Sequence, residues 1–348
     1  VVASVHRAVA TPLFQRTVLE RAPDIACVAP QRVLGLFSGF DFHLTPEGPR
    51  LIEINTNAGG AFFGALIDEM RWRGGDRAAK PFGYWAHVFV DHVRQEWDLA
   101  GRGILRTVAV VDDEPDLQFL RLEFDLAVRA LRDAGIEAFI ADPRELAFRD
   151  GRLYRGATQI DLVYNRLTSF SLARGVDRAL QDALIAGAAV VTPDPRTHVL
   201  LACKRNLALL GDDAFLRDAG VDPSSHGVLL RAVPRTESLT PASAGRLWGE
   251  RAEHYFKPSA GFGSRAVYDG GKLTAKTWRE ILASGGYVAQ QRVEPGRTVV
   301  VGAATLRQAH LVDRGWDGPL IREVEDVGSG SERCYGARRV PPPGQMDQ

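Results

Sequence analysis

Two short segments near the start of the chain alternate apolar and polar residues, and they constrain the fold more than any other feature. They are residues 39–43, which read GFDFH, and residues 51–55, which read LIEIN. A turn-forming stretch at residues 45–49 separates them, so together they predict a β-hairpin. Successive side chains of a strand point to opposite faces. We therefore expect one apolar hairpin face, made of Phe40, Phe42, Ile52 and Ile54.

The other face of this hairpin is acidic. With the turn centred on Glu47, Asp41 falls opposite Glu53, and Asn55 shares a face with Glu53 because the two are two residues apart. Carboxylates placed directly opposite repel each other. A hard cation such as Mg²⁺ relieves that repulsion and also accepts amide oxygens, water and substrate phosphates. The pattern favours a metal site at Asp41, Glu53 and Asn55, with a solvated polar face as the alternative.

The middle of the chain has the pattern of a parallel α/β unit. Residues 106–111 predict a strand, 116–134 a helix with one apolar face, and 136–141 a second strand. Such a crossover is parallel and right-handed. With a further strand at 160–167, residues 104–192 predict a small open α/β lobe. The first strand ends in acids rather than glycines, which argues against a nicotinamide-dependent oxidoreductase.

Two lysines are candidates for binding phosphate. Lys257 ends a predicted strand before a loop that contains Gly261, Gly263 and Ser264. Loop N–H groups and a lysine can bind phosphate oxygens, but the spacing matches neither a Walker loop nor a dinucleotide fingerprint. A plain hairpin turn is the alternative for this loop. Lys204 is the second candidate, and its alternative is an exposed helix cation.

Composition excludes several classes of partner. The 348-residue chain has a formal net charge of zero, so no global field favours nucleic acid or an anionic membrane. No apolar run reaches the length of about 18 residues that a membrane span needs. The three cysteines lie far apart and form neither a CxxC pair nor a disulfide framework. That cysteine usage predicts a cytoplasmic location.

Five segments in this order resemble one family. They read GFDFHLT with LIEINTNAGGAFFG, IDLVYNRL, CKRNLALL, YFKPSAGFGS and YVAQQRVEP. They resemble the circularly permuted ATP-grasp ligases, which include eukaryotic-type glutathione synthetase and the synthetase domain of glutathionylspermidine synthase. The resemblance implies an α/β (α+β) fold, namely a circularly permuted ATP-grasp fold with an inserted Rossmann-like substrate lobe. It also implies four parts: N-terminal helices plus the metal-binding hairpin at 1–103, the inserted lobe at 104–192, the ATP-grasp lid and hinge at 193–301, and a diverged or truncated tail at 302–348.

The same resemblance implies a role for each matching residue. The implied metal ligands are Asp41, Glu53 and Asn55, and the lysines that bind phosphate are Lys204 and Lys257. The lid loop contains Gly261, Gly263 and Ser264, and the hinge that contacts adenine contains Gln290, Gln291, Arg292 and Val293. Arg166 is the implied substrate arginine, and Ser38 and Asn57 are two weaker substrate contacts. The implied cofactors are ATP and Mg²⁺. One position departs from the family pattern, because Gly261 stands where glutathione synthetase has an acidic metal ligand.

The implied activity is ATP-dependent ligation of a carboxylate to an amine through an acyl-phosphate, with Arg166 and Lys257 in catalytic roles. The expected partners are small-molecule carboxylate and amine substrates, with no nucleic acid and no membrane. A homodimer is one possible oligomeric state. A degenerate, non-catalytic ATP-binding protein of the same fold is the alternative function.

Overall fold

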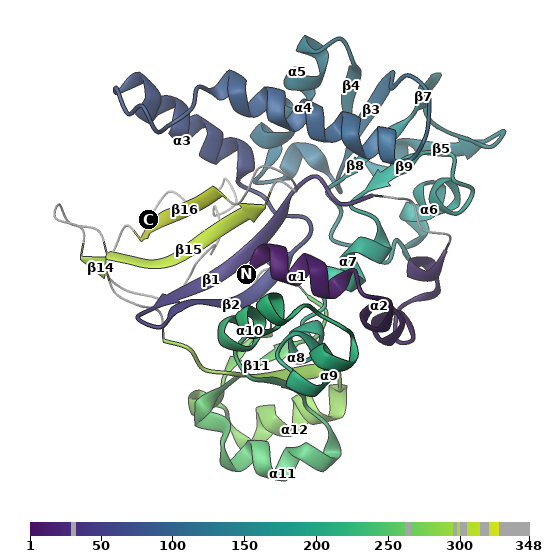
Figure 1. Cartoon of the computed structure of the whole chain (residues 1–348). Coiled ribbons are helices and arrows are strands. Elements are labelled where there is room, and N and C mark those ends of the chain that lie inside the picture. Colours follow the sequence, from purple (N-terminus) through teal and green to yellow (C-terminus); the bar gives the residue numbers. More distant parts are fainter. Residues whose placement is uncertain (29–32, 262–265, 295–297, 300–304, 314–319, 327–348) are drawn as a thin grey trace, which may run out of the picture.

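The computed structural model describes residues 1–28, 33–261, 266–294, 298–299, 305–313 and 320–326. A long hairpin crosses the middle of the molecule, between an upper lobe with a parallel sheet and a lower lobe built around α11 and α12 (Figure 1). Helices and sheets are thus mixed, as the sequence predicts. Within the described residues, no helix combines the length and the apolar character that crossing a membrane requires.

The central sheet contains the predicted hairpin. Strand β1 (Ser38–Thr45) pairs antiparallel with β2 (Gly48–Asn55). The other edge of β1 pairs with β15 (Thr305–Asp313), and β15 also pairs with β14 (Thr298–Val299) and β16 (Leu320–Asp326). Residues 302–348, which the resemblance implies to be a diverged or truncated tail, contribute β15 and β16 to this sheet. The open edge of β1 supplies unpaired backbone groups that a distant strand can bind, whatever its side-chain pattern.

The hairpin register is as predicted at the acids but not along the apolar face. Asp41 lies opposite Glu53. A bulge follows, so that Phe42 pairs with Leu51 and one residue of β2, Ile52, has no partner opposite it. The extra residue reverses the alternation, and Leu51 is fully buried while Ile52 stays half-buried. Leu51 therefore replaces Ile52 on the apolar face, beside Phe40, Phe42 and Ile54.

Helices that precede the hairpin in the chain and helices that follow it both cover this apolar face and share its core. They are α1 (Val2–Val9), α2 (Pro12–Leu19), α7 (Pro195–Leu201), α8 (Asn206–Leu210), α9 (Asp213–Asp218) and α10 (Pro223–Ala232). The α2 helix begins at a proline preceded by Thr11, whose hydroxyl accepts a hydrogen bond from the Phe14 N–H. The polar face of the hairpin is left for the site.

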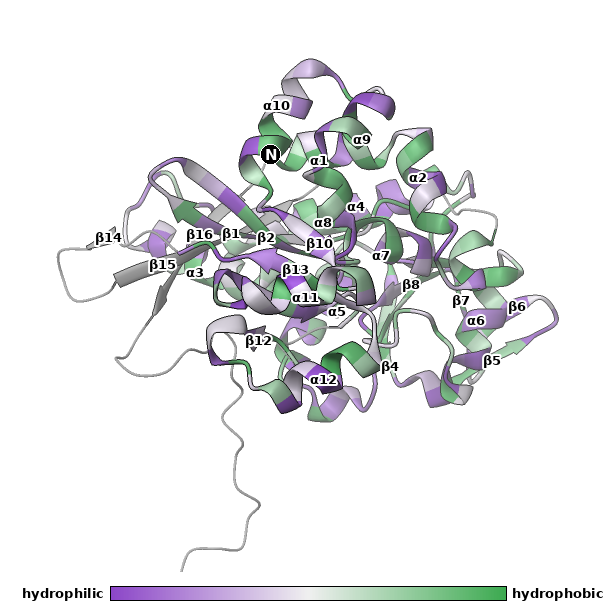
Figure 2. Ribbon diagram, turned by 90° about the horizontal axis from the view of Figure 1, so that it is seen from below, coloured by the Kyte–Doolittle hydropathy of each residue, from purple (hydrophilic) through white to green (hydrophobic). Residues whose placement is uncertain are grey.

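The upper lobe holds the predicted parallel sheet. Its strand order is β4 (Glu137–Ala141), β3 (Thr107–Val111), β8 (Leu162–Asn165) and β9 (Val190–Thr192), all parallel. Both faces are buried, which explains strands such as β4 and β8 that Figure 2 colours mainly hydrophobic. The lobe is completed by α3 (Ala61–Arg73), α4 (Phe82–Leu99), α5 (Arg121–Asp133), α6 (Arg178–Ile185) and the small sheet of β5 (Leu146–Arg149), β6 (Arg152–Arg155) and β7 (Thr158–Ile160).

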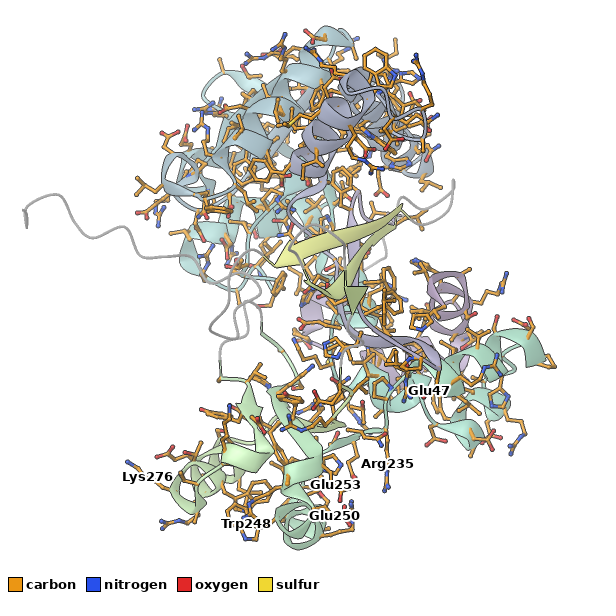
Figure 3. The ribbon with its side chains drawn as sticks, turned by 90° about the vertical axis from the view of Figure 1, so that its left-hand side faces the viewer. Glu47, Arg235, Trp248, Glu250, Glu253 and Lys276 are labelled. Atoms are coloured by element: carbon orange, nitrogen blue, oxygen red, sulfur yellow. The ribbon has the colours of Figure 1, made fainter. Side chains whose placement is uncertain are left out.

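The lower lobe is an antiparallel sheet of order β10 (Thr236–Ser238), β13 (Tyr287–Gln291), β11 (His254–Pro258) and β12 (Tyr268–Asp269). Two helices, α11 (Pro241–Gly249) and α12 (Ala275–Ser284), complete it. Figure 3 labels Trp248 and Lys276 on this lobe, away from the parallel sheet. The division of the chain into four parts stays a prediction.

Candidate active site

The acidic face of the hairpin meets a lysine from a distant part of the chain. The Lys204 ammonium forms an ion pair with Glu53, with 3.0 Å between Nζ and Oε1. The same ammonium donates to the Gly261 carbonyl oxygen at 3.0 Å, and the Lys204 backbone N–H donates to the Ser259 carbonyl oxygen. Lys204 is only 5% exposed. It is therefore not the exposed helix cation of the alternative interpretation.

The second lysine approaches the same face from strand β11. The Lys257 ammonium donates to Gln290 Oε1 at 2.7 Å, and Gln290 Nε2 donates to the Ile52 carbonyl oxygen at 3.2 Å. The bulge in β2 thus joins the hairpin to β13. Burial lowers the pKa of Lys257 to about 8, an effect that the Glu53 carboxylate opposes and the Lys204 ammonium reinforces. The two lysines and Glu53 therefore act on one another electrostatically.

Asp41 and Asn55 complete the acidic face. The Asn55 amide donates to Asp41 Oδ2 at 3.2 Å, so the two side chains point to the same place. No cluster of three or more His, Cys, Asp or Glu side chains able to hold a metal exists among the described residues. Two carboxylates and one amide nevertheless fit Mg²⁺, which usually takes one or two carboxylates and completes its shell with water and phosphate oxygens.

Residues of the predicted hinge contact two different parts of the molecule. The Val293 carbonyl oxygen lies 2.7 Å from His43 Nδ1, which ties the end of β13 to strand β1. Burial lowers the pKa of His43. Arg292 instead donates to the Tyr255 hydroxyl at 3.0 Å and pairs with Asp269. The lysine cluster thus lies beside Gln290 and Val293, while the side chain of Arg292 is bound elsewhere.

His43 was missed by sequence reasoning. Its only signal was its position two residues after Asp41, on the same strand face. Gln291 is exposed, and its backbone N–H donates to the Arg235 carbonyl oxygen. In the predicted lid loop, Gly261 receives the bond from Lys204, while Gly263 and Ser264 lie outside the described residues.

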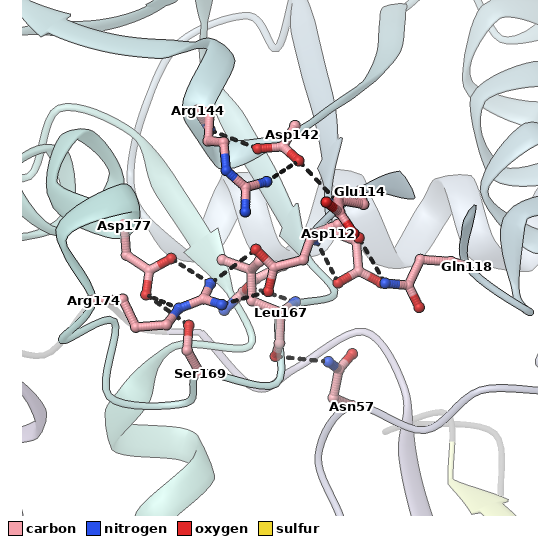
Figure 4. Close-up of polar contacts among 12 residues, drawn as sticks. Asn57, Asp112, Glu114, Gln118, Asp142, Arg144, Leu167, Ser169, Arg174 and Asp177 are labelled. Carbon is pink, nitrogen blue, oxygen red and sulfur yellow. Dashed lines mark hydrogen bonds and ion pairs between the residues drawn. The ribbon is translucent and has the colours of Figure 1, made fainter. Parts of the chain in front are cut away.

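Arg166, at the carboxyl end of β8, is joined to the segment that follows the hairpin. Its Nη1 donates to Asn57 Oδ1 at 2.5 Å, to the Ala58 carbonyl oxygen at 3.1 Å and to the Tyr164 hydroxyl at 3.3 Å. Asn57 Nδ2 donates in turn to the Leu167 carbonyl oxygen (Figure 4). Arg166 is 5% exposed, and within the described ranges it forms no ion pair with a carboxylate. It is a buried cation whose described hydrogen-bond partners are neutral.

More charged groups lie along the same carboxyl edge of the parallel sheet (Figure 4). Asp112 follows β3, and burial raises its pKa to about 6, against the opposing effects of Arg166 and Arg174. The Arg174 guanidinium pairs with Asp113 and Asp177, at 2.6 Å and 2.7 Å. Ligands of open parallel sheets bind at this edge. Sequence reasoning noticed the acids after the first strand but did not place them in a site.

Ser38, the remaining candidate, is buried at the start of β1. Among the described hydrogen bonds, none joins its side chain to the lysine cluster or to Arg166. Its proposed contact with substrate or phosphate stays a prediction.

Comparison by sequence finds no matching family model and no matching curated protein. Solved structures do match. One is a glutathione synthetase-like effector, GSS30, from Globodera pallida in its apo form, with a TM-score of 0.57 over 90% of this chain and 77% of that chain, at 12% identity. The chain has a glutathione synthetase-like fold.

Two other structures are similar to this chain. A putative gamma-glutamylcysteine synthetase from Methylobacillus flagellatus KT has a TM-score of 0.51 over 96% of this chain and 92% of that chain, at 10% identity. The ATP-grasp ligase PsnB, complexed with a phosphomimetic variant of its minimal precursor, Mg and ADP, has a TM-score of 0.36 over 64% and 77%, at 20% identity. The first two matches confirm the predicted resemblance at the level of the fold.

Proposed function

We propose that the protein is an ATP-dependent carboxylate–amine ligase of the circularly permuted ATP-grasp type, with residues 104–192 as its substrate lobe. One observation carries the proposal. Glu53, Lys204 and Lys257 come from three distant segments and converge in one cluster, through the Lys204–Glu53 ion pair and the effect of both groups on the Lys257 pKa. Two buried ammonium groups beside an acidic hairpin suit a triphosphate that carries a divalent cation.

The two lysines would bind the phosphates of ATP. At pH 7 a lysine with a pKa of about 8 is roughly 90% protonated, so Lys257 still supplies a charge. In the nucleotide-free arrangement, Lys204 is neutralised by Glu53. Binding of ATP therefore exchanges this internal ion pair for contacts with phosphate oxygens. Gln290, which holds Lys257 and the Ile52 carbonyl, keeps β11, β13 and the hairpin together during the exchange.

Asp41, Glu53 and Asn55 would hold the magnesium ion. When bound, Mg²⁺ neutralises charge on the phosphates during phosphoryl transfer. Glu53 would then be freed from Lys204, whose charge moves to a phosphate oxygen.

Arg166 would orient the acid. Arg166 forms no direct ion pair among the described residues, although its charge interacts with the Asp112 carboxylate. Such a buried guanidinium attracts an anion, since burial reduces screening by water. The acid's oxygen attacks the γ-phosphorus, the bond to ADP breaks, and an acyl-phosphate forms. The amine then attacks the acyl carbon, phosphate leaves, and the surplus amine proton passes to solvent. Positioning and charge neutralisation supply most of the catalysis, so no nucleophilic side chain is required.

A non-catalytic ATP-binding protein of the same fold is the second candidate. Gly261 favours it, because a glycine there supplies no carboxylate to a metal. A cytoplasmic location and a homodimer also remain proposals.

The test is phosphate release from ATP and Mg²⁺ with a panel of acids and amines. Release that needs both an acid and an amine, and that is lost in Glu53→Gln, supports the ligase. Binding of ATP without release across the panel selects the non-catalytic candidate. Full activity in Glu53→Gln overturns the proposed metal site.

A further inference from the structure

The loop between β3 and α5 exposes two large apolar side chains. Leu117 is 80% exposed and Phe119 is 76% exposed. Isolated apolar residues on a surface are common and need no explanation. Whether this pair has a function therefore depends on how firmly the loop holds them and on what lies next to them.

The loop holds these side chains outward through a fixed backbone. The Leu117 N–H donates to the Glu114 carbonyl oxygen at 2.8 Å, and Gln118 Nε2 donates to the Asp113 carbonyl oxygen at 2.6 Å. Glu114 adopts a left-handed conformation with φ of 42°, and its N–H donates to Asp142 at 2.8 Å (Figure 4). A non-glycine residue stays in that conformation only when its surroundings impose it, and such residues concentrate at functional sites.

The loop also packs directly on the segment that binds Arg166. A Cβ on Gly59 would lie 2.6 Å from Leu120 Cδ1 and 3.6 Å from Arg166 Nη2, so Gly59 lies close to both of these side chains. The Phe119 ring lies 6.5 Å from the Phe63 ring. Phe119 therefore packs near the segment that binds Arg166, and Leu117 is exposed two residues before it in the same loop.

We propose that the acid substrate carries a bulky apolar substituent, which packs on an apolar rim formed by Phe63, Leu117 and Phe119. The inference rests on the proposed function, in which the acid's anionic group lies toward Arg166. A small polar acid would leave the rim in water. An acid with an aromatic or branched aliphatic group covers it and gains on the order of tenfold or more in affinity from the apolar surface buried.

The experiment measures binding separately from turnover. The probes are α- and γ-linked dipeptides in which a single side chain changes from Phe or Leu to Ser or Asp, titrated calorimetrically with Mg²⁺ and a non-hydrolysable ATP analogue present. We expect the Phe and Leu members to bind at least tenfold more tightly than their polar counterparts. The double variant Leu117→Ser, Phe119→Ser should lose that preference while its melting temperature stays within about 1 °C, since both side chains are exposed.

Ile104→Ser is the matched control. Ile104 is also 80% exposed, but it precedes β3, at the opposite edge of the sheet from Arg166. This variant should keep the wild-type preference. Equal binding of apolar and polar members, as expected if the rim serves a protein partner, overturns the inference. So does the absence of dipeptide binding, or a preference that survives in the double variant.

Phosphate release distinguishes this inference from the proposed function. Binding preference without any phosphate release contradicts the ligase and leaves the rim in place. Phosphate release with no preference between side chains supports the ligase and contradicts the rim.

Discussion

Lys257 is expected to weaken the folded protein while serving ATP binding. Its pKa falls from 10.5 to about 8 on burial. At about 1.4 kcal/mol per pKa unit, a charged Lys257 costs the folded state about 3 kcal/mol at pH 7. Lys257→Met removes this cost and loses the bond to Gln290, which offsets about 1–3 kcal/mol because a buried acceptor is left unpaired. We therefore predict unchanged or slightly higher stability, by up to about 2 kcal/mol.

The same substitution should damage nucleotide binding. Losing charge-assisted hydrogen bonds to phosphate costs about 1.5–3 kcal/mol, or roughly 10- to 150-fold in the Kd for MgATP. Calorimetry measures the Kd, and thermal unfolding measures stability. The matched control is Lys276→Met, whose lysine is 82% exposed on the same lobe (Figure 3) and should affect neither quantity. A melting temperature more than about 4 °C below wild type, or an unchanged Kd, would refute the reasoning.

The pH dependence of stability tests independently whether a charged Lys257 destabilises the folded protein. Because the pKa of Lys257 is lower in the folded state than in the unfolded state, the unfolded chain binds more protons between pH 8 and 10.5. This group's cost is fully present below pH 8 and disappears as the pH rises to 10.5. Wild type should gain stability relative to Lys257→Met across that window. A constant difference between the two proteins from pH 7 to 10.5 would contradict the burial of this charge.

Three further predictions concern other parts of the site and its supports. Glu53→Gln keeps an acceptor for the Lys204 ammonium but loses the charge, so the free energy of unfolding should fall by about 1 kcal/mol and phosphate release by at least about 100-fold; wild-type turnover would contradict this. Asn57→Ala removes a partner of Arg166 and should cost about 2 kcal/mol of stability while leaving the Kd for MgATP unchanged; a nucleotide-binding defect equal to that of Lys257→Met would contradict it. Burial raises the pKa of Glu96 to about 7, so wild-type stability should fall as the pH rises from 4.5 to 7; Glu96→Gln should lack that fall and be about 1–2 kcal/mol more stable at pH 8 in thermal unfolding, and an unchanged pH profile would count against it.

Local patterns predicted the hairpin and the parallel sheet because each depends on the spacing of apolar residues over a short stretch of sequence. Turn length set Asp41 opposite Glu53, and two apolar runs around an amphipathic helix predicted the β3–α5–β4 crossover. The bulge at Ile52 was not predictable in this way, because an inserted residue leaves the composition of a strand unchanged. Its carbonyl oxygen nevertheless receives the bond from Gln290 that joins two sheets.

The site depends on contacts between distant segments, which patterns do not encode. Lys204 and Glu53 are far apart in the chain, and only the resemblance to a family suggested that they meet. Motif matching also treated the hinge as a unit, whereas in the structure the Val293 carbonyl oxygen contacts His43 and the Arg292 side chain binds the Tyr255 hydroxyl. The motif identified the hinge segment, but the contacts of its individual residues became clear only from the packing.

The central claim is that the hairpin acids and the two lysines bind one triphosphate. Its most direct test is a crystal structure with a non-hydrolysable ATP analogue and Mn²⁺ in place of Mg²⁺, in which anomalous scattering locates the metal. The account predicts a metal peak in contact with the Glu53 carboxylate, and phosphate oxygens within hydrogen-bonding distance of both Lys204 Nζ and Lys257 Nζ. A nucleotide bound elsewhere, or bound there with the Lys204–Glu53 ion pair intact, would contradict it.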